Sequence, residues 1–456
     1  MWPGRAESAI SHRIGVRINI PYLQGAYLAL NAVPDAFFLG DGPSCIFDKA
    51  AHIHGRHDLF STLLSCDSRH RIQHTGVNVF NIAGDCEGDI AASLRRMAAF
   101  PDCGVVFMGS MPMCSIVGTD YDRILREALA GSDKPSFTMP RRSAVSGDWL
   151  DGYASIMEAM AAGMDLSGAK PKSRNVALVG YLMDRNEGDH LGNLKELERI
   201  VRALGLEPVS IWLSGRPYER LRDVRRAAAV VSMPYGRKAA KILSKRLGAR
   251  LIEAGLPFGL EATRRFVDLL GREFGREDQA QAFIAAELDE VAPRLAWSVP
   301  HVFLNRTFAF SGDPHYALCF AEQIEDLGGR IAGTIVIGGA YHLPEAQRQS
   351  LERRPGTIFE PLPSEIRERW GELARREGGA DLIVGSAFAF SQVHRGPKWL
   401  EFGYPSEDTH FLRDEPFLGF QGALGFLSRV ANEVSRGMNQ EQPPSVAEQA
   451  AQAEGA

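Results

Sequence analysis

Six cysteines are the side chains of this 456-residue sequence best suited to bind a metal ion or a metal cluster. Thiolates are the common protein ligands of zinc and of iron–sulfur centres. No two of the cysteines have the CxxC spacing of a zinc or ferredoxin motif, so a metal site needs ligands from distant segments or from another chain. The six are Cys45, Cys66, Cys86, Cys103, Cys114 and Cys319.

Composition and motifs exclude several other functions. The net charge of −5 provides no basic surface, so we expect no nucleic-acid partner. The sequence contains no GxxxxGK[ST] phosphate loop, and no GxGxxG follows a predicted strand. The opening MWPGRAESAISHR lacks the apolar core of a signal peptide, and no apolar run is long enough to span a bilayer. We therefore expect a cytoplasmic chain without a membrane partner, in which structural disulfides are rare.

Three stretches of the chain alternate short apolar runs with amphipathic helical patterns, which is typical of a parallel sheet flanked by helices. The sequence therefore predicts an α/β fold with three Rossmann-like parallel-sheet domains around a central cleft. The expected strands are 36–39 and 104–108 in the first stretch, 175–180, 208–213 and 228–232 in the second, and 301–304, 331–337 and 380–385 in the third. The expected helices are 89–99, 192–204 and 314–327.

The boundaries of the domains follow from the segments between these stretches. Lys170-Pro171-Lys172-Ser173 has the composition of a linker, and Val299-Pro300 lies near the second junction. The last residues are polar and poor in large apolar side chains, which is typical of disorder. We predict domains over 1–170, 171–298 and 299–437, followed by a disordered tail over 438–456.

Five segments, in the same order along the chain, resemble the component 1 family of nitrogenases and their relatives. The most specific segments lie near the C-terminus, where "FGYP", a histidine and "LGFQGA" resemble the β-type subunits more than the α-type subunits. The resemblance implies the nitrogenase component 1 fold, with three Rossmann-like domains. The segments are Gln24–Leu30 with Leu39–Cys45, Val106–Asp120, Ser311–Pro314 with Leu327–Gly329, Ala380–Ser386, and Phe402–Pro405 with His410 and Leu418–Ala423.

This resemblance implies two cluster ligands, Cys45 and Cys114, as the cofactor-binding and metal-binding residues. Cys45 ends a segment whose final cysteine holds an iron–sulfur cluster in the family. Cys114 lies two positions after the place, now Pro112, where the family has its ligand. The family's first cluster cysteine, which precedes Gly25 in the pattern, is absent from this sequence. Cys86, Cys103 and Cys319 are expected to be structural, and a ligand role of Cys66 stays open.

The size of the cluster stays open. If Cys45 is the single ligand here and a partner subunit contributes three, the resemblance implies a shared 4Fe–4S cluster. If Cys114 and another thiol also bind, an eight-iron cluster like the P-cluster follows. The position that holds a catalytic cofactor in α-type subunits falls near Ser232, which has no thiol, so we expect no catalytic residue on this chain. His410 is expected to make a structural contact, and His52, His54 and His57 to form a solvated face.

The resemblance implies an oxidoreductase that is active only as a complex. We expect a β-type subunit in an α2β2 heterotetramer with an α-type component 1 subunit, receiving electrons from an ATP-dependent iron protein. The substrate stays open among a C–S bond, a tetrapyrrole double bond and N2, and reductive C–S cleavage of the methylthio-alkane reductase type is the specific candidate. Two alternatives in the family are a scaffold for metallocluster assembly and a tetrapyrrole reductase subunit. A third, from another class, is a metal-free binding protein of the periplasmic-receptor type.

Overall fold

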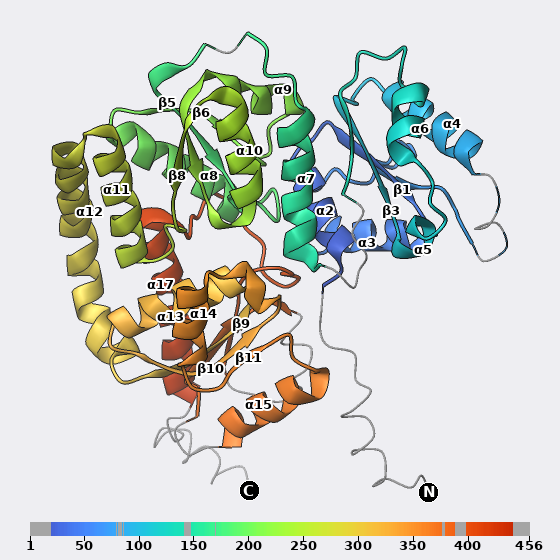
Figure 1. Ribbon diagram of the computed structural model, residues 1–456. Helices are drawn as coiled ribbons and strands as arrows, with labels where there is room; N and C mark the ends of the chain where they lie inside the picture. Colours follow the sequence, from blue (N-terminus) through green and yellow to red (C-terminus); the bar gives the residue numbers. More distant parts are fainter. Residues whose placement is uncertain are drawn as a thin grey trace, which may run out of the picture. The chain divides into compact units, whose positions relative to one another are not determined.

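The computed structural model describes residues 20–78, 80, 84, 86–140, 147–168, 170–375, 379–387 and 398–440. Within these residues the chain forms three sheets whose paired strands are all parallel, with helices packed on their faces (Figure 1). Each sheet lies within one of the three predicted domain ranges. The prediction of three parallel-sheet α/β domains is confirmed, whereas the domain boundaries remain a prediction.

The first sheet has the strand order β2-β1-β3-β4. All six residues of β1 are buried, because both faces of a parallel sheet are covered by helices. This explains why its sequence, AFFLGD, is an apolar run without alternation. The strands are β1 (Ala36–Asp41), β2 (Ile72–His74), β3 (Val105–Ser110) and β4 (Ser136–Thr138), and the helices are α2 (Tyr22–Asn31), α3 (Cys45–Ile53), α4 (Glu87–Ala98), α5 (Pro112–Ser115), α6 (Tyr121–Ala128) and α7 (Trp149–Gly163).

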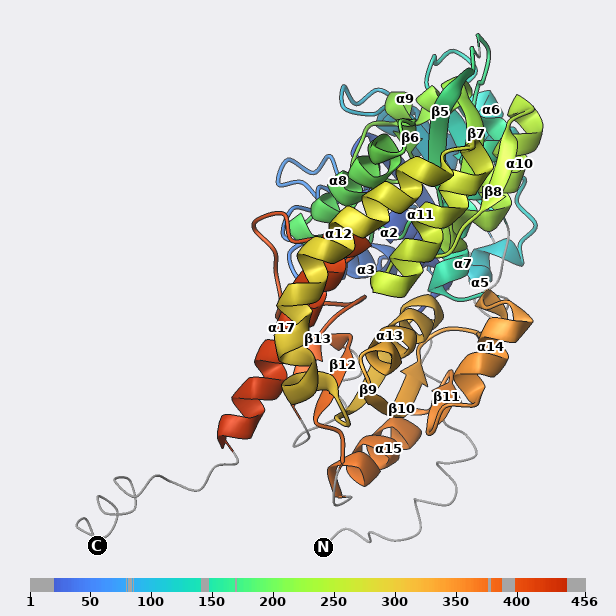
Figure 2. The same cartoon turned by 90° about the vertical axis from the view of Figure 1, so that its left-hand side faces the viewer.

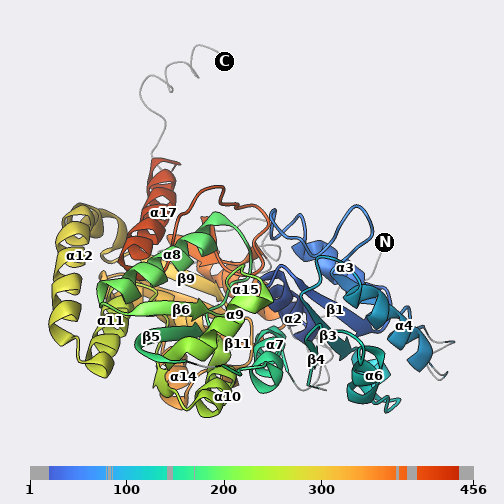
Figure 3. The same ribbon diagram turned by 90° about the horizontal axis from the view of Figure 1, so that it is seen from above.

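The second sheet has the order β6-β5-β7-β8. Helix α7 packs against α2 on one side and against α10 on the other, and so it lies between the first two sheets (Figures 1 and 3). The strands are β5 (Lys172–Val179), β6 (Glu207–Ile211), β7 (Ala227–Ser232) and β8 (Arg250–Glu253). The helices are α8 (Gly188–Ala203), α9 (Tyr218–Leu221), α10 (Arg237–Leu247) and α11 (Leu260–Phe274), with 3-10 turns η1 (Arg222–Arg226) and η2 (Pro234–Gly236).

The third sheet has the order β11-β10-β9-β12-β13. Phe310 of β9 packs on Phe320 of α13, whereas Gly333 of β10 faces Leu373 of α15, so the two helices cover opposite faces of the sheet (Figure 2). The strands are β9 (Thr307–Gly312), β10 (Arg330–Val336), β11 (Thr357–Phe359), β12 (Leu382–Gly385) and β13 (Trp399–Glu401). The helices are α12 (Glu277–Ser298), α13 (Pro314–Asp326), α14 (Glu345–Glu352), α15 (Pro363–Arg375) and α17 (Gly419–Gln440), with the 3-10 turn η4 (Ala340–His342).

The chain divides into two compact units. The described residues of one unit are those within 20–286 and 404–422, which include the first and second sheets. Those of the other are within 287–403 and 423–440, which include the third sheet. The predicted tail falls outside the described residues from 441 onward, and α17 ends at Gln440. Among the described residues, no helix combines the length and the apolar character needed to cross a membrane.

One predicted strand is wrong. Residues 301–304 belong largely to a π-helical turn, η3 (Val299–Phe303), and the first strand of the third sheet begins at Thr307. Pro300 has no N–H to donate to a sheet, and a short apolar run has no periodicity that separates a strand from a buried turn. The run is apolar because it packs on the third sheet, where the ring of Phe303 stacks on Phe308 with a centroid distance of 6.1 Å.

Candidate metal site at the carboxyl edge of the first sheet

The first sheet has its topological switch point between β1 and β3. The chain places β2 on one side of β1 and then crosses to place β3 on the other side. In open parallel sheets, ligands bind at the carboxyl ends of the two strands on either side of such a point. Here β1 ends at Asp41 and leads into the loop before Cys45, and β3 ends at Ser110 and leads into the short helix that contains Cys114.

Cys114 lies on the wall of a cavity of about 310 Å³ at this edge. Its side chain is buried, and Cys86, which directly precedes α4, lines the same cavity. Three carboxyl groups also contribute to the lining, those of Asp41, Glu87 and Asp120. The cavity therefore gathers two thiols and three carboxyl groups from the ends of two neighbouring strands and from the starts of α4 and α6.

The electrostatics of the cavity favour a bound cation. Burial raises the pKa of the Cys114 thiol to about 12, and the nearby groups of Asp41 and Cys86 act in the same direction. The thiol is therefore protonated at neutral pH, and a metal bound there would displace the proton, since the thiolate is the ligand. Asp41 is fixed in place, because one carboxylate oxygen accepts from the Tyr121 hydroxyl at 2.5 Å and the other from the Thr75 hydroxyl at 2.7 Å.

Cys45, the other predicted ligand, is the first residue of α3 and is half-buried. It is not among the residues that line the cavity of Cys114. The loop before it requires glycine at position 42, because a Cβ atom there would lie 2.5 Å from Cγ of Met111. The positive end of the helix dipole lies at Cys45, which favours an anionic ligand or cluster at this point.

These residues fit an iron–sulfur cluster in their chemistry. Such clusters are held by thiolates that converge from several loops, and this edge presents Cys45, Cys86 and Cys114 from three different loops. The structure brings Cys114 and Cys86 to one cavity and places Cys45 at the start of the neighbouring helix. Sequence reasoning assigned Cys86 a structural role, because no motif includes it. Its place on the wall of the cavity follows only from the tertiary structure.

The other three cysteines lie in different settings. Cys103 is buried in the hydrophobic core that contains Phe37 and Val106, and burial raises the pKa of its thiol to about 11. Cys66 is exposed on a loop, and Cys319 is half-buried in α13. Only Cys45, Cys86 and Cys114 therefore lie near the switch point of the first sheet.

Large apolar side chains are exposed beside the cavity. Ile116 and Val117 follow α5 directly, with exposed fractions of 86% and 50%, and Val117 lines the cavity. Phe80, on the segment between β2 and α4, is 95% exposed. Exposed apolar side chains that gather in one region mark protein interaction surfaces. The apolar rim formed by Ile116 and Val117 therefore suits the contact surface of another subunit.

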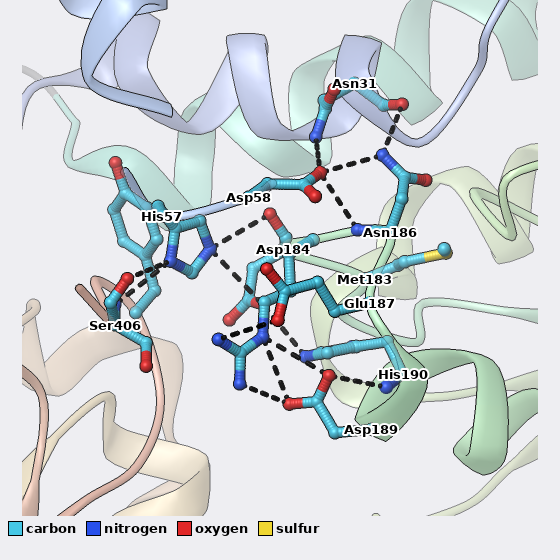
Figure 4. A network of polar contacts seen from close by, with 12 residues as sticks. Asn31, His57, Asp58, Met183, Asp184, Asn186, Glu187, Asp189, His190 and Ser406 are labelled. Atoms are coloured by element: carbon cyan, nitrogen blue, oxygen red, sulfur yellow. Dashed lines mark hydrogen bonds and ion pairs between the residues drawn. The ribbon is translucent and has the colours of Figure 1, made fainter. Parts of the chain in front are cut away.

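A second group of functional-type residues forms a buried polar network around the loop after β5 (Figure 4). Nε2 of His190 lies 2.8 Å from Oδ1 of Asp184, and Nε2 of His57 lies 3.6 Å from the same oxygen. Nδ1 of His57 accepts the backbone N–H of Ser406 at 3.0 Å, so the proton of a neutral His57 is on Nε2, which faces Asp184. Burial opposes charge on His190, but Asp184 and Asp189 outweigh it and raise its pKa.

Glu187 is the second centre of this network and is fully buried. Its carboxylate accepts the backbone N–H groups of Leu59 at 3.0 Å and Phe411 at 2.8 Å, and it pairs with Nδ1 of His410 at 2.8 Å. The neighbouring Arg185 donates to the carbonyl oxygen of Thr409 at 2.8 Å. The network thus holds the segment 404–411 against both the first and the second sheet domains, which is a structural role.

Two expectations about histidines are now resolved. His410 makes the structural contact that its pattern predicted. The expectation of a solvated face is wrong for His57, whose side chain is 1% exposed. Its hydrogen-bond partners lie 127 and 349 residues away in the sequence, so local spacing contained no signal that could have found them.

Comparison with known proteins places these observations in a family. Residues 22–435 match the family model described as nitrogenase component 1 type oxidoreductase. The chain is 20% identical over 368 residues to the nitrogenase molybdenum-iron protein beta chain of Sinorhizobium fredii, covering 75% of this chain and 70% of that one. It is 22% identical over 347 residues to the alpha chain of Methanothermobacter marburgensis, covering 73% and 67%.

The fold is shared with a solved structure. The structure of nitrogenase Cp1 at pH 6.5 has a TM-score of 0.76 and 14% sequence identity, covering 98% of this chain and 97% of that chain. A further curated relative, the beta chain of Bradyrhizobium diazoefficiens, is 21% identical, and the match covers 66% of its length. The chain thus spans about two thirds of the length of the curated relatives, which include both beta and alpha chains.

Proposed function

Because this chain belongs to the nitrogenase component 1 type oxidoreductase family, we propose that it is the β-type subunit of a nitrogenase-like reductase complex. In this complex it holds an iron–sulfur cluster that is shared with an α-type partner. The observation that carries the proposal is that Cys86 and Cys114 line one cavity at the switch point of the first sheet, while Cys45 begins the neighbouring helix α3. The β type is supported by the C-terminal pattern of Phe402–Pro405, His410 and Leu418–Ala423.

Cys45 is the first proposed ligand and Cys114 the second. With Cys45 alone, three partner thiolates complete a 4Fe–4S cluster, and with Cys114 and Cys86 in addition, a P-cluster-like eight-iron cluster can form. When bound, an iron–sulfur cluster supplies one-electron transfer at a potential set by its ligands and surroundings. The protonated thiol of Cys114 must lose its proton to bind, so cluster binding through Cys114 releases a proton.

The residues around the thiols position and cover the cluster. The hydrogen bonds of Asp41 to Tyr121 and Thr75 hold the loops at the ends of β1 and β2 together. The rim of Ile116 and Val117 exposes apolar surface that a partner subunit would cover. Covering it removes water from the cluster, and solvent exposure is one of the factors that set a cluster's potential.

The remaining parts of the reaction belong to the partners. The sequence has no phosphate loop, so ATP hydrolysis falls to a separate iron protein that delivers electrons. The catalytic site falls to the α-type subunit in an α2β2 heterotetramer. We propose reductive cleavage of a C–S bond, of the methylthio-alkane reductase type, as the reaction. The alternatives within the family are a scaffold on which a metallocluster is assembled and a subunit of a tetrapyrrole reductase.

The test is anaerobic co-purification of the chain with its α-type partner, followed by iron analysis and EPR of the reduced complex. A 4Fe–4S cluster requires about four irons per αβ pair, and an eight-iron cluster about eight. Cys45→Ala is expected to remove most of this iron, whereas the matched control Cys66→Ala, on an exposed loop, is expected to keep it. Full iron content and an unchanged EPR signal in Cys45→Ala would overturn the assignment of Cys45.

The two family alternatives separate in the same preparation. A reductase keeps its iron when a metal chelator is added and transfers electrons from the reduced iron protein. A scaffold releases its cluster to an apo acceptor protein and shows no such electron transfer. Iron that moves to the acceptor would therefore favour the assembly scaffold.

A further inference from the structure

Tyr27 carries a buried hydroxyl group that has no hydrogen-bond partner in the described part of the chain. The side chain is 0% exposed, so water at the surface does not reach it. Buried tyrosine hydroxyls normally find a partner, and a buried polar group without one costs free energy. Such a group calls for a ligand or a function that explains it.

The position of Tyr27 directs its hydroxyl toward the carboxyl edge of the first sheet. Helix α2 leads into β1 through a tight turn, where the N–H of Ala36 donates to Val33, and packs back along that strand. Side chains of a helix lean toward its N-terminus, which for α2 is the direction of the carboxyl end of β1. The ring of Tyr27 contacts the ring of Phe38 in the middle of β1, with centroids 5.6 Å apart.

The packing of α2 on α3 places Cys45 at this same edge. Gln24, in the first turn of α2, donates to the carbonyl oxygen of Lys49 at 3.3 Å. A Cβ atom at Gly40 would lie 3.0 Å from Cε1 of Phe38 and 2.7 Å from Cδ1 of Ile46, so the ring that Tyr27 contacts lies beside the residue that follows Cys45.

We propose that the Tyr27 hydroxyl donates a hydrogen bond to the sulfur of Cys45, or to a cluster sulfide beside it, when the cluster is bound. The proposal rests on the proposed function, because it requires Cys45 to be a ligand. Tyr27 is a positioning residue in this role, since it acts through the ligand sulfur. Hydrogen bonds to the sulfurs of a cluster stabilise its more negative, reduced state and raise its reduction potential.

The experiment compares Tyr27→Phe with the wild-type complex. Phenylalanine keeps the ring that packs on Phe38 and removes only the hydroxyl. The matched control is Tyr22→Phe, which removes a hydroxyl from another buried tyrosine of the same helix. Each complex is titrated with mediators while the cluster is followed by EPR, and the Fe–S stretching bands are recorded by resonance Raman spectroscopy in H2O and D2O.

In Tyr27→Phe we expect a full iron content and a lower midpoint potential. The ratio of reduced to oxidised cluster at a fixed solution potential should fall by roughly tenfold, the effect of one hydrogen bond to a charged group. For a one-electron couple this equals about 59 mV. The D2O shift of the Fe–S bands should shrink in this variant, and Tyr22→Phe should resemble the wild type.

An unchanged potential and unchanged Raman bands in a fully loaded Tyr27→Phe complex would overturn the hydrogen bond and leave the proposed function intact. A loss of iron, with the remaining clusters at the wild-type potential, would also overturn it, because Tyr27 would then have a packing role only. A wild-type complex without iron would instead overturn the proposed function, and the inference about Tyr27 with it.

Discussion

The Nε2 atom of His190 lies 2.8 Å from Oδ1 of Asp184, and both side chains are buried between the first and second sheet domains. His57, which comes from the first domain, approaches the same carboxylate at 3.6 Å. One buried carboxylate of the second domain therefore contacts an imidazole of its own domain and an imidazole of the first domain. A buried charge is tolerated only when it is paired and hydrogen-bonded, so this connection is sensitive to the loss of either partner.

Replacing Asp184 tests the energetic weight of this connection. We expect Asp184→Ala to lower the free energy of unfolding by about 3–5 kcal/mol, because it leaves His190 and His57 without their buried counter-charge. The control is Asp414→Ala, which removes the surface ion pair with Lys195 and should cost less than about 1 kcal/mol. Urea unfolding followed by circular dichroism measures both. Equal costs for the two substitutions would contradict the buried connection.

The pH dependence of stability tests the protonation of His190. Its pKa in the folded state is raised above 6.5, so its contribution is fully present below pH 6.5 and is lost as the pH rises through the folded value. We expect the free energy of unfolding to decrease over this range in the wild type. The His190→Gln variant should lack this part of the slope, while other titrating groups act equally in both proteins. Identical pH profiles of the two proteins would exclude a charged His190.

At acid pH the carboxylate of the same pair dominates. His190 and His57 lower the pKa of Asp184 below its ordinary value of 3.8, against the effect of burial. The contribution of Asp184 is therefore present above pH 3.8 and is lost as the pH falls below it. We expect the free energy of unfolding of Asp184→Asn to depend less on pH in this range than that of the wild type. Parallel acid-unfolding curves would speak against the lowered pKa.

Gly25 tests the packing that supports the cysteine loops. A Cβ atom at this position would lie 1.6 Å from the carbonyl oxygen of Trp149, so Gly25→Ala must separate α2 from α7. We expect the free energy of unfolding to fall by about 1–3 kcal/mol or more, the usual cost of overpacking a core. Gly88→Ala is the control, because a Cβ atom there meets nothing within 4 Å, and alanine is the better helix former. Thermal unfolding that ranks the two variants in the opposite order would contradict this packing.

A substitution in the apolar rim tests where the partner subunit binds. We expect Ile116→Asp to weaken association with the α-type partner by more than tenfold, because it buries a charge at the interface. The stability of the isolated chain should not change, since this side chain is exposed. Leu412→Asp, at a residue that is 81% exposed in the segment after His410, serves as the control. Sedimentation analysis measures both affinities. Equal affinities of the two variants would place the interface elsewhere.

Most strands of the three sheets could be predicted from the sequence, because strands buried on both faces are apolar runs. The run 36–39 lies in β1 and the run 228–232 lies in β7. The run 104–108 lies in β3 apart from residue 104. The prediction at 301–304 is wrong for the same reason, since a buried turn after a helix is also an apolar run. Periodicity describes what a segment buries, and a short segment can bury the same side chains in either conformation.

The candidate site, too, could be predicted from the sequence only in part. Cys45 and Cys114 could be proposed from the sequence, because short motifs surround them at the ends of the predicted strands 36–39 and 104–108. Cys86 has no motif, and only the tertiary structure places it on the wall of the cavity of Cys114. The orphaned hydroxyl of Tyr27 could not be seen at all, because a missing hydrogen-bond partner is a property of the packed structure.

The sequence by itself determined the α/β class, the family and the cysteine loops, because these depend on local apolar runs and on motifs of neighbouring residues. Only the tertiary structure decided the surroundings of His57 and Glu187, whose hydrogen-bond partners lie more than a hundred residues away in the sequence. A polar side chain can be buried only where distant segments supply its hydrogen bonds and counter-charges. That supply depends on how the segments pack, which no local pattern in the sequence describes.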